Sequence, residues 1–146
     1  MTIRPAVALD ADDLERMARD FVASSPYGAL LKLDSSRVRD LIDAMLESED
    51  AMIFVAQGAG GDVVGMIALQ VLEHPMSGDQ MATELVWWVD PARRGTAGVR
   101  LLRIAEMWAK SRGATLLQMV APDARVGEFY AAVGYQAAET AYMKRI

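Results

Sequence analysis

The sequence predicts a single α/β domain with a mixed, mostly antiparallel sheet, and two observations lead to this fold. Three apolar segments follow one another with short turn-rich links, at residues 52–57, 63–73 and 82–89. Such spacing is typical of an antiparallel meander. The next apolar segment, 115–120, is reached through a loop and a helix, and a crossover of that kind places its two strands parallel.

The length of 146 residues suits one domain, which we expect to span 1–146. The chain has no Cys, so it has no disulfide or zinc-thiolate site, and no metal is expected. No apolar run reaches the ~20 residues that span a bilayer, and the first residues lack the layout of a signal peptide. We therefore expect a cytoplasmic protein. The one His, His74, lies in a loop beside Pro75, where a surface role is expected.

Before the meander, the pattern predicts a short edge strand and two helices. Ile3–Ala6 contains a proline, which is typical of an edge strand. Asp10 and Asp12 are the expected caps of a helix that runs to about residue 25, and Asp34 is expected to open a second helix that ends near residue 48.

After the meander, a loop at 90–98 leads into a helix predicted over 99–112, which Gly113 ends. Asp123 is expected to start a final helix that stops at Gly134. The interrupted apolar pattern of residues 135–146 predicts one or two closing strands.

The charge is unevenly distributed along the chain. Residues 1–92 carry 6 Lys/Arg and 16 Asp/Glu, whereas residues 93–146 carry 9 and 4. Six of these basic residues fall within 93–112. A local basic cluster on an acidic protein suits a discrete anionic ligand better than a long polyanion. A solvated, arginine-rich helix face is the alternative.

The segment that carries most chemical information is Glu84–Leu102, in which a strand leads into a basic, Gly-containing loop that opens a helix. Free backbone N–H groups and the dipole at a helix start favour an anion such as phosphate. The loop is not a P-loop, because no Gly-Lys-Ser/Thr follows, and it is not a G-x-G-x-x-G fingerprint. An αβ connection with incidental arginines is the other interpretation.

Two motifs resemble one known family, the GNAT N-acetyltransferases. Residues 93–98 (RRGTAG) are similar to the R/Q-x-x-G-x-G/A signature, and 129–135 (FYAAVGY) to the (L/F)-Y-x-x-x-G-(F/Y) segment. The order of elements also matches along essentially the whole chain. The resemblance implies an α/β fold of the GNAT type, with a sheet splayed between its fourth and fifth strands and helices on both faces.

The resemblance also implies acetyl-CoA as acyl donor. The signature loop would hold its pyrophosphate, with Arg93 and Arg94 adding charge and the backbone amides of residues 94–98 forming the cradle. Main-chain groups of Trp88 and Val89 would pair with pantetheine and polarise the thioester. Arg100 or Arg103 is expected to reach the 3′-phosphate. The cofactor-binding residues implied in this way are Trp88, Val89, Arg93, Arg94, Gly95, Thr96, Ala97, Gly98 and Asp123.

Two positions depart from the family pattern. Thr96 stands where the signature has its central Gly, and a side chain there resists a positive φ. Either Gly95 and Gly98 supply the freedom, or the pyrophosphate is held less tightly. Asp123 replaces a frequent Asn, and an ionised Asp caps a helix but donates no side-chain hydrogen bond.

Direct transfer to an amine needs a base and an acid. Tyr130 matches the family position of the acid, and a buried core tyrosine is the alternative. Glu84 lies where several members place a base that acts through water, and an exposed strand carboxylate is the alternative. Strand alternation predicts that Glu84 shares a face with Val86 and Trp88, where a tryptophan would raise its pKa.

Acceptor contacts are expected from Phe21, Tyr27 and Leu31, in the first helix and the loop after it. The acidic first 92 residues favour a cationic or neutral small-molecule or protein amine over a nucleic acid. We expect no membrane partner, and a homodimer is compatible with the sequence. A catalytically silent module that binds acyl-CoA or another protein, and an unrelated phosphate-binding regulator, are alternatives of different classes.

Overall fold

The computed structural model describes residues 1–146 and contains one five-stranded sheet with the order β1-β2-β3-β4-β5. The first four strands pair antiparallel with their neighbours, and β4 pairs parallel with β5. The mixed sheet, the meander and the crossover are therefore confirmed. The strands are β1 (Thr2–Pro5), β2 (Ala51–Gln57), β3 (Val63–Glu73), β4 (Gln80–Val89) and β5 (Leu116–Gln118).

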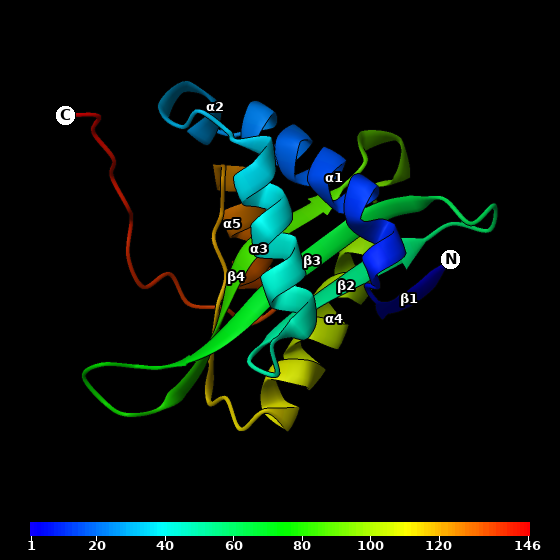
Figure 1. Ribbon diagram of the computed structural model, residues 1–146. Coiled ribbons are helices and arrows are strands. Elements are labelled where there is room, and N and C mark those ends of the chain that lie inside the picture. Colours follow the sequence, from blue (N-terminus) through cyan, green and yellow to red (C-terminus); the bar gives the residue numbers. More distant parts are fainter.

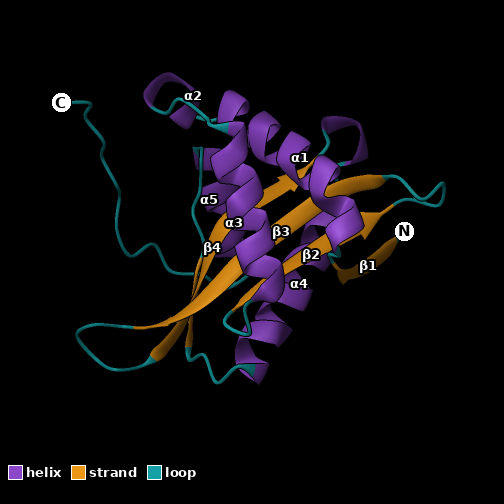
Figure 2. Ribbon diagram, in the orientation of Figure 1, coloured by secondary structure: helices purple, strands orange, loops and turns teal.

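Helices cover both faces of the sheet, as Figures 1 and 2 show. On one face, α1 (Ala11–Ser24) and α3 (Ser35–Glu47) enclose a core cluster that includes Leu14, Met17 and Ile42. On the other face, α4 (Thr96–Ser111) packs Leu101 and Ala105 into a second cluster. The remaining helices are α2 (Tyr27–Leu30), α5 (Ala124–Ala132) and the 3-10 turns η1 (Ala8–Asp10) and η2 (Pro91–Arg93).

Two predicted helix caps, Asp34 and Asp123, are confirmed, and the two predicted for α1, Asp10 and Asp12, are wrong. The carboxylates of Asp34 and Asp123 accept hydrogen bonds from the N–H groups of the third helical residues, at 3.1 and 2.9 Å. Asp10 precedes α1 but does not cap it, because its carboxylate pairs with Arg4 and accepts from the Val7 N–H. Asp12 lies inside the helix.

The sheet is splayed between β4 and β5, which positions the functional site. The two strands pair only where Met81–Thr83 meets Leu116–Gln118. β5 is thus three residues long, shorter than the predicted 115–120. Beyond Thr83 the edge of β4 has no strand beside it on the β5 side, and this open edge continues to Val89.

The prediction of closing strands in 135–146 is wrong, because this segment contains no strand. It leaves α5 and runs past β5 toward α2 as an extended chain (Figure 1). Side-chain hydrogen bonds attach it at three points, from Tyr135 to Glu106, from Gln118 to Glu139 and from Arg145 to the Leu30 carbonyl. No helix of the structure combines the length and the apolar character that crossing a membrane requires.

Candidate functional site

A cavity of about 590 Å³ lies where β4 and β5 diverge. Four elements form it: the C-terminal end of α1, the end of β4, the first turn of α4 and the start of α5. Seven of the predicted site residues line it: Phe21, Trp88, Val89, Arg94, Gly95, Gly98 and Asp123. The splay therefore brings the signature loop and the downstream helix to one cavity.

The signature loop turns at Gly95, which has a φ of 134°, and a Cβ at this position would meet no atom within 4 Å. Thr96 is the first residue of α4, and no residue other than glycine has a positive φ. Thr96 therefore replaces the signature glycine without backbone strain. A Cβ on Gly98 would lie 3.3 Å from Trp87 Cζ2, so the first turn of α4 approaches β4 closely.

Among the arginines of the basic cluster, Arg94 lines the cavity. Its Nε donates to the Val89 carbonyl at 3.3 Å, and its Cζ lies 5.4 Å from the Trp88 ring centroid, a cation–π contact. Arg93 instead lies 3.5 Å from Asp62, and Arg100 donates to the Met1 carbonyl at 2.9 Å. The cluster is thus dispersed, and part of it serves contacts within the protein.

Arg125 is a cavity residue that sequence reasoning missed. Arg125 follows the helix cap Asp123 by two positions. The predicted start of this helix was therefore the signal in the sequence that could have identified Arg125 as a site residue. Two arginines therefore line one cavity, Arg94 from the loop before α4 and Arg125 from the first turn of α5. The other lining residues that were not predicted are Ser24, Ser25, Trp87, Val99, Pro122, Val126 and Phe129.

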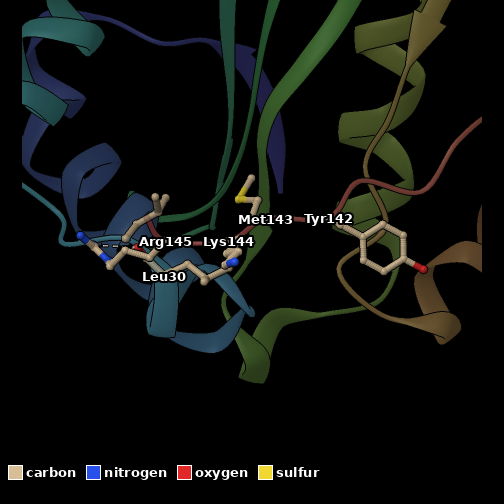
Figure 3. A pocket seen from close by; sticks show the side chains of 6 residues that line it. Leu30, Tyr142, Met143, Lys144 and Arg145 are labelled. Atoms are coloured by element: carbon tan, nitrogen blue, oxygen red, sulfur yellow. Dashed lines mark hydrogen bonds between the residues drawn. The ribbon is translucent and has the colours of Figure 1, made fainter.

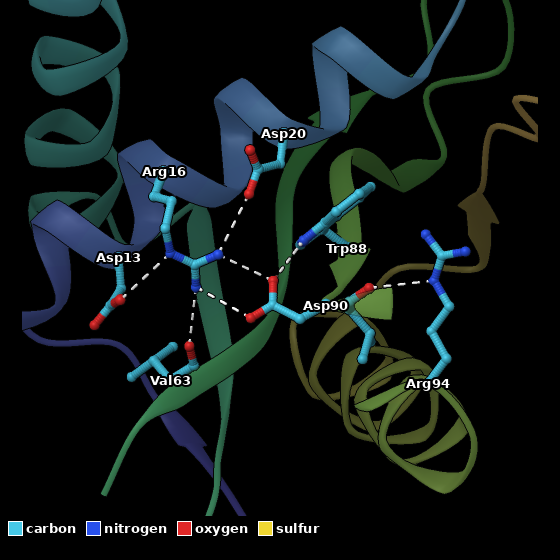
Figure 4. Close-up of polar contacts among 8 residues, drawn as sticks. Asp13, Arg16, Asp20, Val63, Trp88, Asp90 and Arg94 are labelled. Atoms are coloured by element: carbon cyan, nitrogen blue, oxygen red, sulfur yellow. Dashed lines mark hydrogen bonds and ion pairs between the residues drawn. The ribbon is translucent and has the colours of Figure 1, made fainter. Parts of the chain in front are cut away.

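Asp90, at the end of β4, connects the loop to α1 (Figure 4). Its Oδ1 accepts from Arg16 Nη1 and from Trp88 Nε1, both at 3.0 Å, and its Oδ2 accepts from Arg16 Nη2 at 3.3 Å. Arg16 also donates to the Val63 carbonyl at 3.1 Å. The Trp88 indole in the cavity wall is therefore held by an ion pair outside the cavity.

A β-bulge in β4 changes the predicted face of Glu84. Leu69 of β3 pairs with Glu84 while Ala68 pairs with Val86, so Leu85 is an extra residue. Val86 and Trp88 face the α1 side of the sheet, whereas Leu69, opposite Glu84, belongs to the α4 side. The prediction that Glu84 shares a face with Val86 and Trp88 is therefore wrong. Side chains alternate strictly only along an uninterrupted strand, and the bulge interrupts β4.

Glu84 lies at the point where the two strands part. Its Oε2 accepts from the Val120 N–H at 3.0 Å, a backbone group that β4 no longer pairs. Burial raises the pKa of the Glu84 carboxyl to about 7, and the Val120 hydrogen bond offsets part of that effect. A carboxyl with such a pKa can exchange a proton near neutral pH.

Tyr130 reaches the same residue, Val120, from α5. Its hydroxyl donates to the Val120 carbonyl at 3.2 Å, and its buried ring stacks on Trp87 with centroids 5.7 Å apart. Burial, followed by the charges of Glu84 and Tyr135, raises the pKa of the Tyr130 hydroxyl. Neither Tyr130 nor Glu84 is among the residues that line the cavity.

The Trp87 indole lines the cavity and stacks on the Tyr130 ring. Its Nε1 is buried and has no hydrogen-bond partner, which is costly for a polar group. Trp87 also packs against Phe129, at a centroid distance of 5.9 Å.

The three predicted acceptor contacts do not share one cavity. Phe21 lines the main cavity, and the Tyr27 ring lies 6.4 Å from the Phe21 ring. Leu31 belongs to a separate cavity between α2 and the C-terminal segment. Three further predicted residues, Arg93, Thr96 and the buried Ala97, also lie outside the cavity lining.

Comparison with known proteins agrees with this geometry. Residues 14–135 match the family described as "Acetyltransferase (GNAT) family". A transcriptional regulator from Bacillus halodurans has 21% identity and a TM-score of 0.81, with 99% of each chain covered. An aminoglycoside 6′-N-acetyltransferase from Acinetobacter haemolyticus has 19% identity and a TM-score of 0.76, covering 100% of this chain and 99% of its own.

A ribosomal-protein-alanine N-acetyltransferase from Brucella melitensis biovar Abortus has 17% identity and a TM-score of 0.73, with 100% of both chains covered. At these identities the structural neighbours establish the fold alone. Among curated proteins, none matches the sequence. Because the family match spans most of the chain, including the signature loop and the tyrosine segment, this chain belongs to the GNAT acetyltransferase family.

Proposed function

We propose that the protein transfers an acetyl group from acetyl-CoA to a primary amine by direct attack in a ternary complex. One observation carries the proposal. The edge of β4 from Glu84 to Val89 is open beside a cavity that also receives Arg94 and Arg125. Such an edge can pair with the amide groups of pantetheine, and the two guanidinium groups can bind phosphates.

The residues at the cavity fit acetyl-CoA as donor. Gly95 and Gly98 line the cavity without a side chain, and the N–H groups at the start of α4 would bind the pyrophosphate. Arg94 supplies charge from the cavity wall. Arg94 Nε donates a hydrogen bond to the Val89 carbonyl in this structure. If the Arg94 side chain rotated toward a phosphate of the donor, the Val89 carbonyl would be free to pair with pantetheine. Asp123 contributes by capping α5 at the cavity rim.

In the proposed reaction, the amine nitrogen attacks the thioester carbonyl carbon and the carbon–sulfur bond breaks. The amine proton goes to the Glu84 carboxylate, by way of water because Glu84 lies outside the cavity lining. A pKa of about 7 suits this role, since close to half of the carboxyl is ionised at neutral pH. Backbone groups of Trp88 and Val89 would stabilise the oxyanion.

The departing CoA thiolate receives its proton from the Tyr130 hydroxyl. The raised pKa of this hydroxyl keeps it protonated until the thiolate forms. Tyr130 would have to release the Val120 carbonyl to reach the sulfur. Val120 therefore links acid and base, since its N–H holds Glu84 and its carbonyl holds Tyr130.

The proposed acceptor is a cationic or neutral amine rather than a nucleic acid. The charge distribution along the chain supports this, because residues 1–92 carry 16 Asp/Glu against 6 Lys/Arg and include the end of α1 that lines the cavity. A nucleic acid would need a basic surface at that entrance. We propose a small molecule or an exposed protein amine as the acceptor class.

A second candidate is a silent acyl-CoA-binding module. The observation that favours it is that neither Glu84 nor Tyr130 lines the cavity. If the cavity keeps this lining when the donor is bound, acetyl-CoA would bind without reaching either group. This candidate shares the donor site and differs in the absence of turnover.

Calorimetric titration with acetyl-CoA, with free CoA and ADP as controls, tests the donor site. Micromolar binding of acetyl-CoA that ADP does not reproduce supports it, and no binding at millimolar ligand contradicts it. Thiol release is then measured across a panel of amines, diamines, aminoglycosides and peptides with free amino termini. Binding without amine-dependent thiol release would favour the silent module.

A further inference from the structure

The Val89 carbonyl is an edge group of β4 that faces the cavity. The N–H of the next residue, Asp90, donates to the Val64 carbonyl of β3 at 2.8 Å. Because the backbone groups of successive strand residues point to opposite sides, the N–H and carbonyl of Val89 point away from β3, toward the side that β5 leaves open. Val89 also lines the cavity. Its carbonyl is therefore the last acceptor of β4 that a ligand lying along the open edge would meet.

The guanidinium of Arg94 occupies this acceptor. Its Nε donates to the Val89 oxygen at 3.3 Å (Figure 4), and its Cζ lies 5.4 Å from the centroid of the Trp88 ring. Val89 and Trp88 are both lining residues, so the guanidinium lies against the strand edge inside the cavity. An amide of a ligand could take this place on Val89 only after Arg94 had moved aside.

The Trp88 ring that carries Arg94 is itself held in position. Asp90 Oδ1 accepts from Trp88 Nε1 at 3.0 Å, and Arg16 pairs with the same carboxylate. Because the indole is fixed in this way, the cation–π contact has a defined geometry. Moving Arg94 aside therefore costs a hydrogen bond from a charged donor and a cation–π contact.

Arg94 has further donors that a phosphate can use. A guanidinium carries five N–H donors, and only the Nε–H of Arg94 bonds a protein group. A phosphate offers charge-assisted, bidentate hydrogen bonds, which can replace the two contacts that Arg94 would leave. A ligand without phosphate offers Arg94 nothing in exchange.

We propose that Arg94 makes the donor site selective for thioesters that carry phosphate, because it covers the Val89 carbonyl until a phosphate draws the guanidinium away. This role rests on the proposed function, since it concerns the donor of that reaction. It gives Arg94 two opposite effects: the residue favours acetyl-CoA and opposes a thioester that has the pantetheine arm alone. An arginine that only attracted phosphate would have the first effect without the second.

The test compares three donors that share the pantetheine arm and differ in phosphate: acetyl-CoA, S-acetyl-4′-phosphopantetheine and S-acetylpantetheine. Titration calorimetry measures each dissociation constant, with competition against acetyl-CoA for the weaker ligands. Arg94→Ala should weaken acetyl-CoA binding by about tenfold and strengthen S-acetylpantetheine binding by roughly fivefold. S-acetyl-4′-phosphopantetheine should give an intermediate change.

Arg125→Ala is the matched control inside the cavity. Arg125 lines the same cavity, whereas the hydrogen bond to the Val89 carbonyl comes from Arg94. The control should bind acetyl-CoA more weakly and should not gain affinity for S-acetylpantetheine. A gain in both variants would indicate a general effect of removing positive charge, and would contradict the role of Arg94. A gain confined to Arg94→Ala cannot come from a loosened fold, because a disturbed site binds less.

Arg145→Ala is a second control, because Arg145 also donates to a backbone carbonyl. It bonds the Leu30 oxygen at 3.0 Å, beside a separate cavity of about 450 Å³ (Figure 3). Leu30 belongs to helix α2, so its carbonyl is not an edge group of the sheet. Removing this arginine should leave the affinities for all three donors unchanged. A gain for S-acetylpantetheine here would overturn the assignment to Arg94.

Failure of this role and failure of the proposed function give different results. If the wild-type protein does not bind acetyl-CoA at millimolar ligand, both fall. If it binds acetyl-CoA but Arg94→Ala binds S-acetylpantetheine no more tightly than wild type does, the donor site stands. The selectivity role of Arg94 alone is then overturned.

Discussion

The guanidinium of Arg16 in α1 is paired with the carboxylate of Asp90 at the end of β4, through hydrogen bonds of 3.0 and 3.3 Å. The same carboxylate accepts from the Trp88 indole, and Arg94 lies over the Trp88 ring. A continuous chain of contacts thus runs from Arg16 in α1 to Arg94 in the signature loop. Because Asp90 directly follows β4, its hydrogen bonds to Arg16 and Trp88 fix the direction in which the chain leaves this strand.

Asp90→Asn should weaken acetyl-CoA binding by about tenfold, because an amide loses the charge-assisted pair that orients Trp88 and Arg94. Since Asp90 does not line the cavity, its effect should fall on KM for acetyl-CoA more than on kcat. Asp20→Asn is the matched control, since Asp20 contacts the same Arg16 at 3.3 Å without contacting Trp88. Equal effects of the two variants would contradict a positioning role for Asp90.

The pH profile tests Glu84. A base acts when it is ionised, so kcat/KM should rise with pH through about 7 and then level off. Glu84→Gln keeps an acceptor for the Val120 N–H but removes the base, and should lower turnover by roughly 100-fold and abolish this limb. A limb near pH 7 that persists in the variant would assign it to another group.

Stability should show the opposite dependence on pH. The folded protein raises the pKa of Glu84 from 4.5 to about 7, so between these values it binds more protons than the unfolded chain. Its free energy of unfolding should therefore decrease as pH rises through this window. Glu84→Gln should be less sensitive there, and on the order of 1 kcal/mol more stable than wild type at pH 8. Urea unfolding at several pH values measures both effects.

Tyr130→Phe tests the acid. The variant keeps the ring that stacks on Trp87 and loses the hydroxyl, so acetyl-CoA affinity should change little. Turnover should fall by roughly 10²–10³ if the thiolate takes its proton from this group. Loss of the hydrogen bond to Val120 should cost about 1 kcal/mol of stability. Tyr135→Phe, which removes a hydroxyl bonded to Glu106, is the control and should retain activity.

The arginines of the signature loop should differ in their effect on the donor. The double variant Arg93→Ala, Arg94→Ala should weaken acetyl-CoA binding. Most of this loss should come from Arg94→Ala, by about tenfold, because Arg94 lines the cavity and Arg93 faces Asp62. Arg100→Ala is the control, since Arg100 bonds the Met1 carbonyl. Titration calorimetry would contradict this order if Arg93→Ala had the larger effect.

The sequence predicts the sheet and its helices because their signals are local. Alternating or continuous apolar runs, Asp34 and Asp123 as caps, and Gly113 and Gly134 as stops each act within a few residues. The splay and the signature loop are accessible through resemblance to a family. The strand pairing confirms the splay, and the family match confirms the resemblance.

Other features depend on contacts that sequence spacing does not show. The bulge at Leu85 reverses the face of Glu84, and it is visible only when β3 and β4 are set in register. Asp10 has the composition of a cap, but Arg4 on the neighbouring strand binds it instead. The segment 135–146 has an apolar pattern suited to a strand, yet it runs toward α2, where Arg145 bonds the Leu30 carbonyl, and pairs with no strand.

Gly95 and Gly127 should respond oppositely to the same substitution. Gly95 has a φ of 134°, so Gly95→Ala should destabilise the protein by about 1–2 kcal/mol and loosen the loop that follows β4. Gly127 lies inside α5, where a Cβ would make an ordinary 3.7 Å contact with Ala121. Gly127→Ala should stabilise by about 0.5–1 kcal/mol, because alanine favours the helix.

Thermal unfolding of both variants measures these changes, and acetyl-CoA titration adds a second readout. Gly95→Ala should bind acetyl-CoA more weakly even at temperatures where the variant is fully folded, since the side chain strains the turn that opens α4. Gly127→Ala should bind it as wild type does. Equal affinity of the Gly95 variant would mean that the loop tolerates the strain, and that the donor's pyrophosphate depends on Arg94 and the helix start rather than on this turn.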